Sequence, residues 1–574
     1  MSNNITLMIG GIQGEGIVST GNILIKTLSR LGLYTYGFRN FASRIKGGHT
    51  NYIIEISSEK VLAKDDKIDI LIASDMETVE NNINILKDNG LLIHDSTIDP
   101  KDYFTKENFH ILSFPFTDIA KKHGKAIMKN TALIGFLGKL LRIPMENIDE
   151  IIRETYNKKG KDTVLKNLLI LEKSYSYPVD IENFSDKYGL KITSSKEARA
   201  SMVGNEAVAL GALMAGCRLM TAYPITPASE IMEYLSKKLY KYNGKLVQTE
   251  DEIAAVTMAI GGSYGGVRSM TATSGPGISL MMEGIGLAGM AEIPLVIVDS
   301  QRVGPSTGLP TKHEQSDIKI LYNGSHGEIP LIIVTPYSVE ECFYRTIDAF
   351  NLAEKYQCPV FILSDLTLGL SRQTIAPLDK NKIIIDRGKI VDVDKLSEST
   401  CDFRRFDFTT DNISPRSLPG MENGIHKVTG LEHSVIGVPN NNPENRKKMM
   451  DKRLNKLKEM ELQDNIDLFG NLSSELLVLS IGSNYGIIKK AVEDFDLPVI
   501  YGMFKMIKPL PKKQLEYLFN KYSKILIVEN NATKQLFSII KQEFSNHEKL
   551  YSLTKYDGLP FKIREIKDKV EELI

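Results

Sequence analysis

The feature that most constrains the fold is a series of four polar or glycine-rich loops between Tyr223 and Thr311, each lying beside an apolar run. In parallel α/β sheets, the loops at the carboxyl ends of the strands meet at one edge and line a ligand crevice. The series therefore predicts an α/β domain with one composite site. The loops are Tyr223-Pro-Ile-Thr-Pro227, Glu250-Asp-Glu252, Ser274-Gly-Pro-Gly277 and Gln301-Arg-Val-Gly-Pro-Ser-Thr-Gly308.

The first loop holds Thr226 between two prolines, after an apolar run at 207–220 that predicts a helix. Proline fixes its own φ and biases the preceding residue toward extended geometry, so the Thr226 hydroxyl has a defined position. Taken alone, an ordinary loop with a helix cap at Thr226 or Ser229 is the more frequent interpretation. Thr226 becomes a candidate for a ligand site only together with the other loops.

The second loop ends at Glu252, directly before the apolar run 253–262, which predicts a buried helix. A carboxylate there gains from the helix dipole and lies where water is scarce, which suits it to share a proton with a ring nitrogen. Thiamine diphosphate needs such a partner, because a glutamate bonded to its aminopyrimidine promotes the imino tautomer. Simple capping by a charged first turn is the alternative, and Glu250 competes for the role.

The last two loops follow predicted strands at 267–273 and 294–298. Glycines 275 and 277 permit a close approach of the backbone to a ligand. Arg302 is a candidate carboxylate clamp, because a guanidinium pairs bidentately with a carboxylate, and Thr226, Thr307 and Thr311 can add neutral hydrogen bonds. An arginine more often lies at the surface and forms an ion pair with an acidic neighbour, which is the alternative interpretation.

Together these motifs closely resemble the α subunit of 2-oxoacid:ferredoxin oxidoreductases, a family that oxidatively decarboxylates 2-oxoacids with coenzyme A, thiamine diphosphate and iron–sulfur clusters. By this resemblance Thr226 and Arg302 bind substrate and Glu252 activates the cofactor. The implied catalytic residues are Glu252, Arg302 and Thr226; the substrate-binding residues are Thr226, Arg302, Thr307 and Thr311; the cofactor-binding residues are Glu252, Pro224, Ser274 and Gly275.

The N-terminal part, Thr6 to about Leu190, resembles the γ subunit of the same complexes, which implies a γ–α fusion. Its glycines, Gly10 to Gly16, also suit a Rossmann-like turn, but no acidic residue follows the strand at 34–38 to hold a ribose. Backbone amides at the following helix can bind a phosphate of coenzyme A, or the glycines can serve tight packing. The coenzyme A candidates are Gly14, Lys46 and Gly47.

Two absences from the sequence point to a partner. The Gly-Asp-Gly motif that anchors the cofactor diphosphate through Mg²⁺ in this superfamily does not occur, and the four cysteines form no Cys-x-x-Cys pair and predict no metal site. We therefore expect a separate β subunit to carry the diphosphate half, the Mg²⁺ and an iron–sulfur cluster, with ferredoxin as the acceptor. One departure from the family pattern falls at Asn530 and Lys534.

Composition places the chain among large globular proteins, because 574 residues allow several domains. Balanced counts of 71 acidic and 71 basic residues give no case for nucleic acid or membrane binding, and few scattered cysteines predict a cytoplasmic location. The lysine-rich helix predicted at 443–460 should place its charges on a solvated face. Late β-rich runs alternate with helices and predict a parallel sheet.

The expected fold is thus multidomain α/β. A Rossmann-like γ-type domain should span 1–190, a pyrimidine-binding thiamine diphosphate domain 198–377, an irregular segment 378–463, and a transketolase C-terminal-like domain 464–574. The expected function is coenzyme A-dependent decarboxylation of a 2-oxoacid, with 2-oxoglutarate favoured. Alternatives are pyruvate or branched-chain specificity, a non-catalytic assembly subunit, and a nucleotide-binding dehydrogenase.

Overall fold

The computed structural model describes residues 4–41, 48–100, 108–192, 199–392, 394, 396, 402–471, 473–544 and 547–574. The chain divides into two compact units, each with its own core. The N-terminal unit comprises Met1–Met202, Leu370–Leu378 and Lys562–Arg564, and the C-terminal unit comprises Val203–Gly369, Asp379–Phe561 and Glu565–Ile574.

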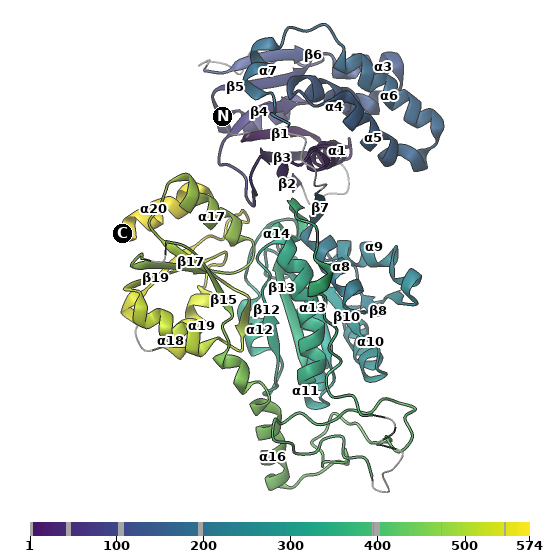
Figure 1. The fold of residues 1–574 in the computed structure, drawn as a ribbon, viewed down its shortest axis with the longest axis vertical. Coiled ribbons are helices and arrows are strands. Elements are labelled where there is room, and N and C mark those ends of the chain that lie inside the picture. Colours follow the sequence, from purple (N-terminus) through teal and green to yellow (C-terminus); the bar gives the residue numbers. More distant parts are fainter. Residues whose placement is uncertain are drawn as a thin grey trace. The chain divides into compact units, whose positions relative to one another are not determined.

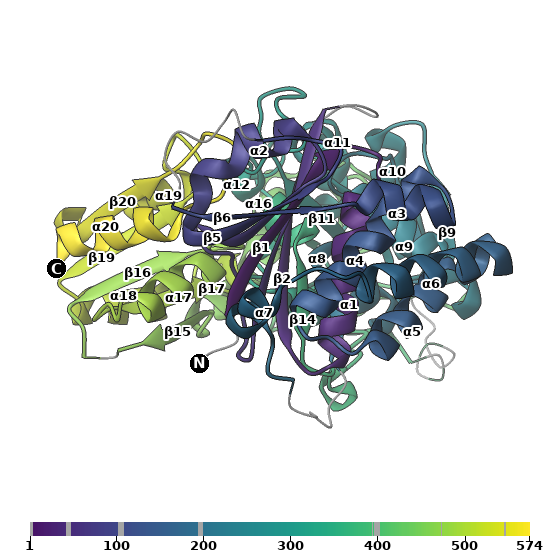
Figure 2. The same ribbon diagram turned by 90° about the horizontal axis from the view of Figure 1, so that it is seen from above.

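The N-terminal unit is built on an eight-stranded mixed sheet with the order β6-β5-β4-β1-β3-β2-β14-β7, and five of its helices gather on one side of that sheet (Figure 2). The strands are β1 (Ile5–Ile12), β2 (Tyr34–Phe41), β3 (His49–Ser57), β4 (Ile68–Ala73), β5 (Leu86–Asp95), β6 (His110–Phe114), β7 (Ala200–Val203) and β14 (Arg372–Ile375). The five helices are α1 (Ile17–Arg30), α3 (Phe116–His123), α4 (Lys129–Leu140), α5 (Met145–Tyr156) and α6 (Lys161–Tyr175); the unit also contains α2 (Met76–Asn82) and α7 (Glu182–Tyr188).

The glycine-rich turn after β1 has left-handed backbone at Gly14 (φ 96°) and Gly16 (φ 92°), which explains why glycine occupies both positions. The helix α1 follows, as predicted. However, β3 lies between β1 and β2 and is antiparallel to both. The strands that would be neighbours in a dinucleotide-binding βαβ unit are therefore separated, and the sheet departs from the nicotinamide-binding arrangement.

The first part of the C-terminal unit is a seven-stranded sheet with the order β18-β12-β13-β11-β10-β8-β9. Its strands are β8 (Leu219–Ala222), β9 (Lys245–Gln248), β10 (Ser269–Thr273), β11 (Leu295–Gln301), β12 (Ile332–Val334), β13 (Pro359–Asp365) and β18 (Met506–Lys508). Its helices are α8 (Gly204–Met214), α9 (Ser229–Ser236), α10 (Glu252–Tyr264), α11 (Gly275–Met290), α12 (Ile318–Asn323), α13 (Val339–Tyr356) and α14 (Leu366–Leu370).

One helix prediction here was too long. The apolar run 207–220 contains the end of α8 and the start of β8, because Gly216 turns the chain in a left-handed conformation (φ 84°) between them. Apolar character alone does not distinguish a buried helix from a buried strand.

The last part of the chain forms a five-stranded sheet with the order β15-β17-β16-β19-β20, with α17 and α20 on one side and α18 and α19 on the other (Figure 1). Its strands are parallel except for β15, which is antiparallel to β17. The strands are β15 (Ile466–Gly470), β16 (Leu476–Ser480), β17 (Ile500–Phe504), β19 (Lys524–Glu529) and β20 (Leu550–Thr554); the helices are α17 (Asn484–Asp494), α18 (Lys512–Lys521), α19 (Gln535–Glu543) and α20 (Ile563–Leu573).

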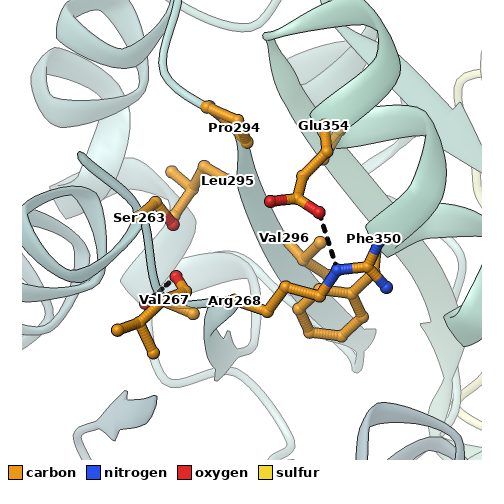
Figure 3. A pocket seen from close by; sticks show the side chains of 10 residues that line it. Ser263, Val267, Arg268, Pro294, Leu295, Val296, Phe350 and Glu354 are labelled. Atoms are coloured by element: carbon orange, nitrogen blue, oxygen red, sulfur yellow. Dashed lines mark hydrogen bonds and ion pairs between the residues drawn. The ribbon is translucent and has the colours of Figure 1, made fainter. Parts of the chain in front are cut away.

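The segment between these two sheets is mostly irregular and is held by buried ion pairs. Arg268 on the edge of β10 and Arg416 in the segment both bind Glu354 of α13, with N–O distances of 2.8 and 3.0 Å. Figure 3 shows the Arg268–Glu354 pair beside a cavity of about 10 Å³, which has room for at most one water and so serves packing.

The helix α16 (Pro443–Asn455) is shorter than predicted, and its charges do not all face solvent. Lys452 and the following Lys456 are fully buried and bind Glu292, at 2.6 and 2.9 Å. The predicted solvated face is present at Arg446, Lys447 and Lys448, which are exposed, but the prediction failed for the two lysines that a buried partner needs. Glu292, which interrupts the apolar run 284–298, is that partner. Among the described residues, no helix is long and apolar enough to cross a membrane.

Candidate active site

The four predicted loops meet at one edge of the seven-stranded sheet. They follow the carboxyl ends of β8, β9, β10 and β11, which are parallel neighbours in the order β11-β10-β8-β9. Ala222 pairs with Gln248, and Thr273 pairs with Asp299, so the loops leave the sheet at nearly the same height. This edge is where parallel α/β sheets bind ligands.

Glu252 is the first residue of α10, after Asp251, whose side chain caps the helix by accepting from the Ala254 N–H at 2.7 Å. Capping is thus performed by Asp251 and not by Glu252. The Glu252 side chain is 6% exposed and makes no hydrogen bond to any described residue. It lies against Gly277, where an added Cβ would be 2.8 Å from Glu252 Oε1. A buried carboxyl group beside a bare glycine fits the pyrimidine ring of thiamine.

Arg302 directly follows β11 and is 7% exposed. Its Nη1 donates to the Thr226 carbonyl oxygen at 2.7 Å, and its Nη2 donates to the Thr307 carbonyl oxygen at 3.5 Å. Its Nε is buried and has no hydrogen-bond partner among the described residues. Burial lowers the pKa of Arg302, but a guanidinium stays protonated in proteins, so the site contains a buried cation with unused donors.

Arg302 lines a cavity of about 760 Å³ at the start of α11. The opposite lining comes from the region after β19, including Asn531, Gln535 and Tyr556. Asp317 also lines it and lies against Gly275, where an added Cβ would be 2.6 Å from Asp317 Oδ1. The cavity has the size of a small-molecule site with a few polar groups.

The loop that carries Asp317 is fixed by Gln315, which is fully buried. The Gln315 Nε2 donates to Asp365 Oδ2 at 3.0 Å, and the Gln315 N–H donates to the Asn530 carbonyl oxygen at 2.7 Å. The Asn531 Nδ2 in turn donates to the Gln315 carbonyl oxygen at 3.0 Å. These contacts tie the candidate site to the strand ends of the five-stranded sheet.

The structure brings most of the sequence-derived candidates together. Ser274 is buried at the start of α11, and Pro224 is half-buried after β8. The contacts differ from expectation in one respect, because Thr226 and Thr307 meet Arg302 through their carbonyl oxygens. Thr311 lies in the turn that closes the fourth loop and is not among the residues lining the cavity.

Sequence reasoning missed Asp299 and Asp317, as well as the positioning residues Gln315, Asp365 and Asn531. The signal available for Asp299 was its place at the end of an apolar strand, three residues before Arg302. Asp317 had no comparable signal, because its proximity to Gly275 depends on how the chain returns to the sheet.

A second cavity, of about 330 Å³, lies in the N-terminal unit at the start of α1. Gly14, Gly16 and Arg39 line it. Lys46 and Gly47, the other coenzyme A candidates, lie outside the described residues. Within the described parts of the chain, no group of three metal-ligating side chains occurs, and Cys217, Cys342 and Cys358 are buried free thiols.

Comparison with known proteins agrees with this architecture. Residues 210–452 match the family model described as pyruvate flavodoxin/ferredoxin oxidoreductase, thiamine diphosphate-binding, and residues 6–177 match pyruvate ferredoxin/flavodoxin oxidoreductase. The C-terminal unit is therefore, in its first part, a thiamine diphosphate-binding domain.

Relatives of known family identify the family of this chain. A 2-oxoacid:ferredoxin oxidoreductase subunit alpha from Sulfolobus sp is 34% identical over 99% of this chain and 96% of the relative. The KorA subunit of 2-oxoglutarate synthase from Methanocaldococcus jannaschii is 37% identical over 62% of this chain and 95% of its own length. A solved 2-oxoglutarate:ferredoxin oxidoreductase from Magnetococcus marinus superimposes with a TM-score of 0.90 at 34% identity, covering 99% of both chains.

The chain belongs to the 2-oxoacid:ferredoxin oxidoreductases and corresponds to their α subunit. It is a subunit of an oxidoreductase with ferredoxin as the acceptor. The predicted multidomain α/β fold is confirmed, including the fusion of a γ-type domain to the α-type part.

Proposed function

We propose that this chain provides the pyrimidine half of the thiamine diphosphate site and the carboxylate-binding residues of an enzyme that converts 2-oxoglutarate and coenzyme A to an acyl-coenzyme A and CO2. The observation that carries the proposal is the buried Glu252 against Gly277, on the same sheet edge as the buried cation Arg302. The names of the relatives from Methanocaldococcus jannaschii and Magnetococcus marinus support 2-oxoglutarate as the substrate.

Glu252 would hold the proton at the aminopyrimidine nitrogen. Its burial and its lack of a protein partner leave its carboxyl group available to the ring, and Asp251 leaves it free of capping. When bound, thiamine diphosphate supplies the electron sink that accepts the charge left by departing CO2. Pro224, Ser274 and Gly275 would shape the walls around the ring.

Arg302 would bind the substrate carboxylate and orient the bond to be broken. The Thr226 and Thr307 carbonyl oxygens fix the guanidinium from one side, and the remaining N–H groups can serve the ligand. Because Arg302 is almost fully buried, its charge acts in a site of low dielectric constant, where it attracts an anion more strongly than in water. The hydroxyl groups of Thr226 and Thr311 would add neutral hydrogen bonds.

The test of these roles uses the chain assembled with its cofactor-anchoring partner. The Glu252→Gln variant should lose at least a hundredfold in kcat, the lower end of the usual contribution of acid–base catalysis. Glu250→Gln, two residues away, is the matched control and should retain turnover. Arg302→Ala should raise the KM for the 2-oxoacid; unchanged substrate affinity would instead support a non-catalytic assembly subunit. A panel of 2-oxoglutarate, pyruvate and branched-chain 2-oxoacids would establish the substrate.

The partner would be a β subunit that carries the diphosphate and Mg²⁺ half. The surface of α10 and α11 favours this, because Ile253, Met258 and Leu280 are 52%, 42% and 51% exposed. The helix α10 begins at Glu252 and the first turn of α11 lies against that residue, so a partner seated on these side chains would lie beside the cofactor site. Met258→Glu or Leu280→Glu should abolish co-purification with the β subunit. Leu165→Glu, at an exposed leucine of the N-terminal unit, should not.

Coenzyme A would place a phosphate at the cavity lined by Gly14, with Lys46 and Gly47 as further candidates. The start of the 14-residue helix α1 directs backbone N–H groups toward that cavity, and Arg39 adds a positive charge. Arg39→Ala should raise the KM for coenzyme A and leave the KM for the 2-oxoacid unchanged. An equal rise in both constants would contradict this assignment.

A further inference from the structure

Two buried carboxyl groups lie behind Arg302 and are not explained by the roles proposed above. Asp299 belongs to β11 and is fully buried, and neither of its oxygens has a hydrogen-bond partner among the described residues. The Oδ2 of Asp317 is likewise buried without a partner. An ionised carboxylate is costly to bury without a partner, so burial favours the protonated form of each group.

The surroundings of both groups favour their protonated forms. Burial, reinforced by the negative charge of Glu314 and opposed by Arg302, raises the pKa of Asp317 to about 7. Burial and the neighbouring Asp317 raise the pKa of Asp299 well above its usual value. The start of α11 favours an anion at Asp317, but this helix-end effect is smaller than the combined effect of burial and the charge of Glu314.

The two acids differ in what they can reach. Asp317 is partly exposed and lines the 760 Å³ cavity together with Arg302, whereas Asp299 is sealed within the sheet. Gly275 allows Asp317 to lie directly over the start of α11, because any side chain at that position would displace it. Of the two acids, only Asp317 can therefore present a proton to a ligand in the cavity.

We propose that Asp317, in its protonated form, is a substrate-binding residue that donates a hydrogen bond to the 2-oxoacid held by Arg302. This inference rests on the proposed function and adds a donor that the resemblance did not supply. A neutral acid beside Arg302 leaves the cavity receptive to an anion. Loss of the Asp317 proton places its carboxylate, together with that of Glu314, beside the single cation, and the substrate is repelled.

The test is the pH dependence of kcat and KM in the assembled complex. In the wild type, the KM for the 2-oxoacid should rise above pH 7, approaching tenfold per pH unit, while kcat changes less. Asp317→Asn keeps a donor of the same size that does not titrate, so its KM should stay flat over that range.

The control is Asp451→Asn, at an exposed aspartate of α16, which should reproduce the wild-type profile. A KM that rises with pH in Asp317→Asn as it does in the wild type would overturn the proposal.

An infrared titration of the full chain tests the proton on Asp317 without relying on activity. Part of the carbonyl absorption of protonated carboxylic acids should decline as the pH rises through 7, and this part should be missing in Asp317→Asn. Absence of the pH-dependent part in an active complex would refute this inference alone. Its presence in a complex inactive with every 2-oxoacid would refute the proposed function, and with it the substrate-binding role, while confirming a protonated Asp317.

Discussion

Replacing Glu292 by glutamine should destabilise the C-terminal unit more than any surface substitution. The side chains of Glu292, Lys452 and Lys456 are all fully buried, with N–O distances of 2.6 and 2.9 Å. At these distances the attraction is about 6 kcal/mol per pair for an effective dielectric constant of 20, and desolvation cancels much of it. Removing the carboxylate leaves two buried ammonium groups without their counter-ion, which costs about 3–5 kcal/mol.

The pH dependence of this loss has a defined sign. Burial, opposed by Glu292, lowers the pKa of Lys452 to about 8. Without Glu292 that opposition is lost, so Lys452 in the folded variant releases its proton at a lower pH than in the wild type. The variant then gains stability relative to the wild type as the pH rises toward 8, by up to about 1.4 kcal/mol per pH unit. The deficit should therefore be largest in mildly acidic solution.

The assay is urea unfolding of the full chain followed by circular dichroism, because the sequence contains no tryptophan. Glu572→Gln is the control, since Glu572 pairs with Lys569 at the surface and should contribute little. Glu292→Leu combined with Lys452→Met and Lys456→Met should recover most of the loss. A Glu292→Gln variant within about 1 kcal/mol of the wild type at pH 7 would refute the reasoning, because breaking a buried pair carries a larger cost.

Three further predictions concern the site and the packing around it. Gly277→Ala should lower kcat at least tenfold, because its Cβ would come within 2.0 Å of Thr273 Oγ1 and 2.8 Å of Glu252 Oε1; unchanged kcat and thiamine diphosphate affinity would contradict the placement of Glu252. Arg302→Lys should raise the KM for the 2-oxoacid about 10- to 100-fold, since an ammonium group cannot form a bidentate pair, and steady-state kinetics measure this. Gly261→Ala should stabilise the isolated chain by about 0.5–1 kcal/mol in urea unfolding, because this exposed helical glycine has open space where a Cβ would lie.

The sequence predicted that the four loops share one sheet edge, because the position of each loop is encoded locally. Each of the four loops directly follows a strand, and parallel strands place their carboxyl ends together whatever the remaining chain does. The extent of Glu252 burial was also predictable from the apolar run that begins at the next residue. The atoms used by each residue were not predictable: Thr226 contacts Arg302 through its carbonyl oxygen, and only the folded backbone shows this.

The failures have a common physical origin in contacts between distant parts of the chain. Lys452 is buried because Glu292, 160 residues earlier, is buried and needs a counter-ion. Asp317 lies against Gly275 because Gln315 ties its loop to the strand ends of a sheet built more than a hundred residues later. Neither burial nor proximity of this kind leaves a periodic or compositional signal.

The Gln315 contacts also suggest why the α-type part ends in a second sheet. Gln315, which holds the loop of Asp317, donates to Asn530 and accepts from both Asn530 and Asn531. Its side-chain amide donates to Asp365 on β13. Buried networks of this kind hold one geometry, because every unmet hydrogen bond inside the protein is costly. The five-stranded sheet thus fixes the height of Asp317 above Gly275. The position of this proposed substrate-binding residue therefore depends on a domain that contributes only the opposite wall of the cavity.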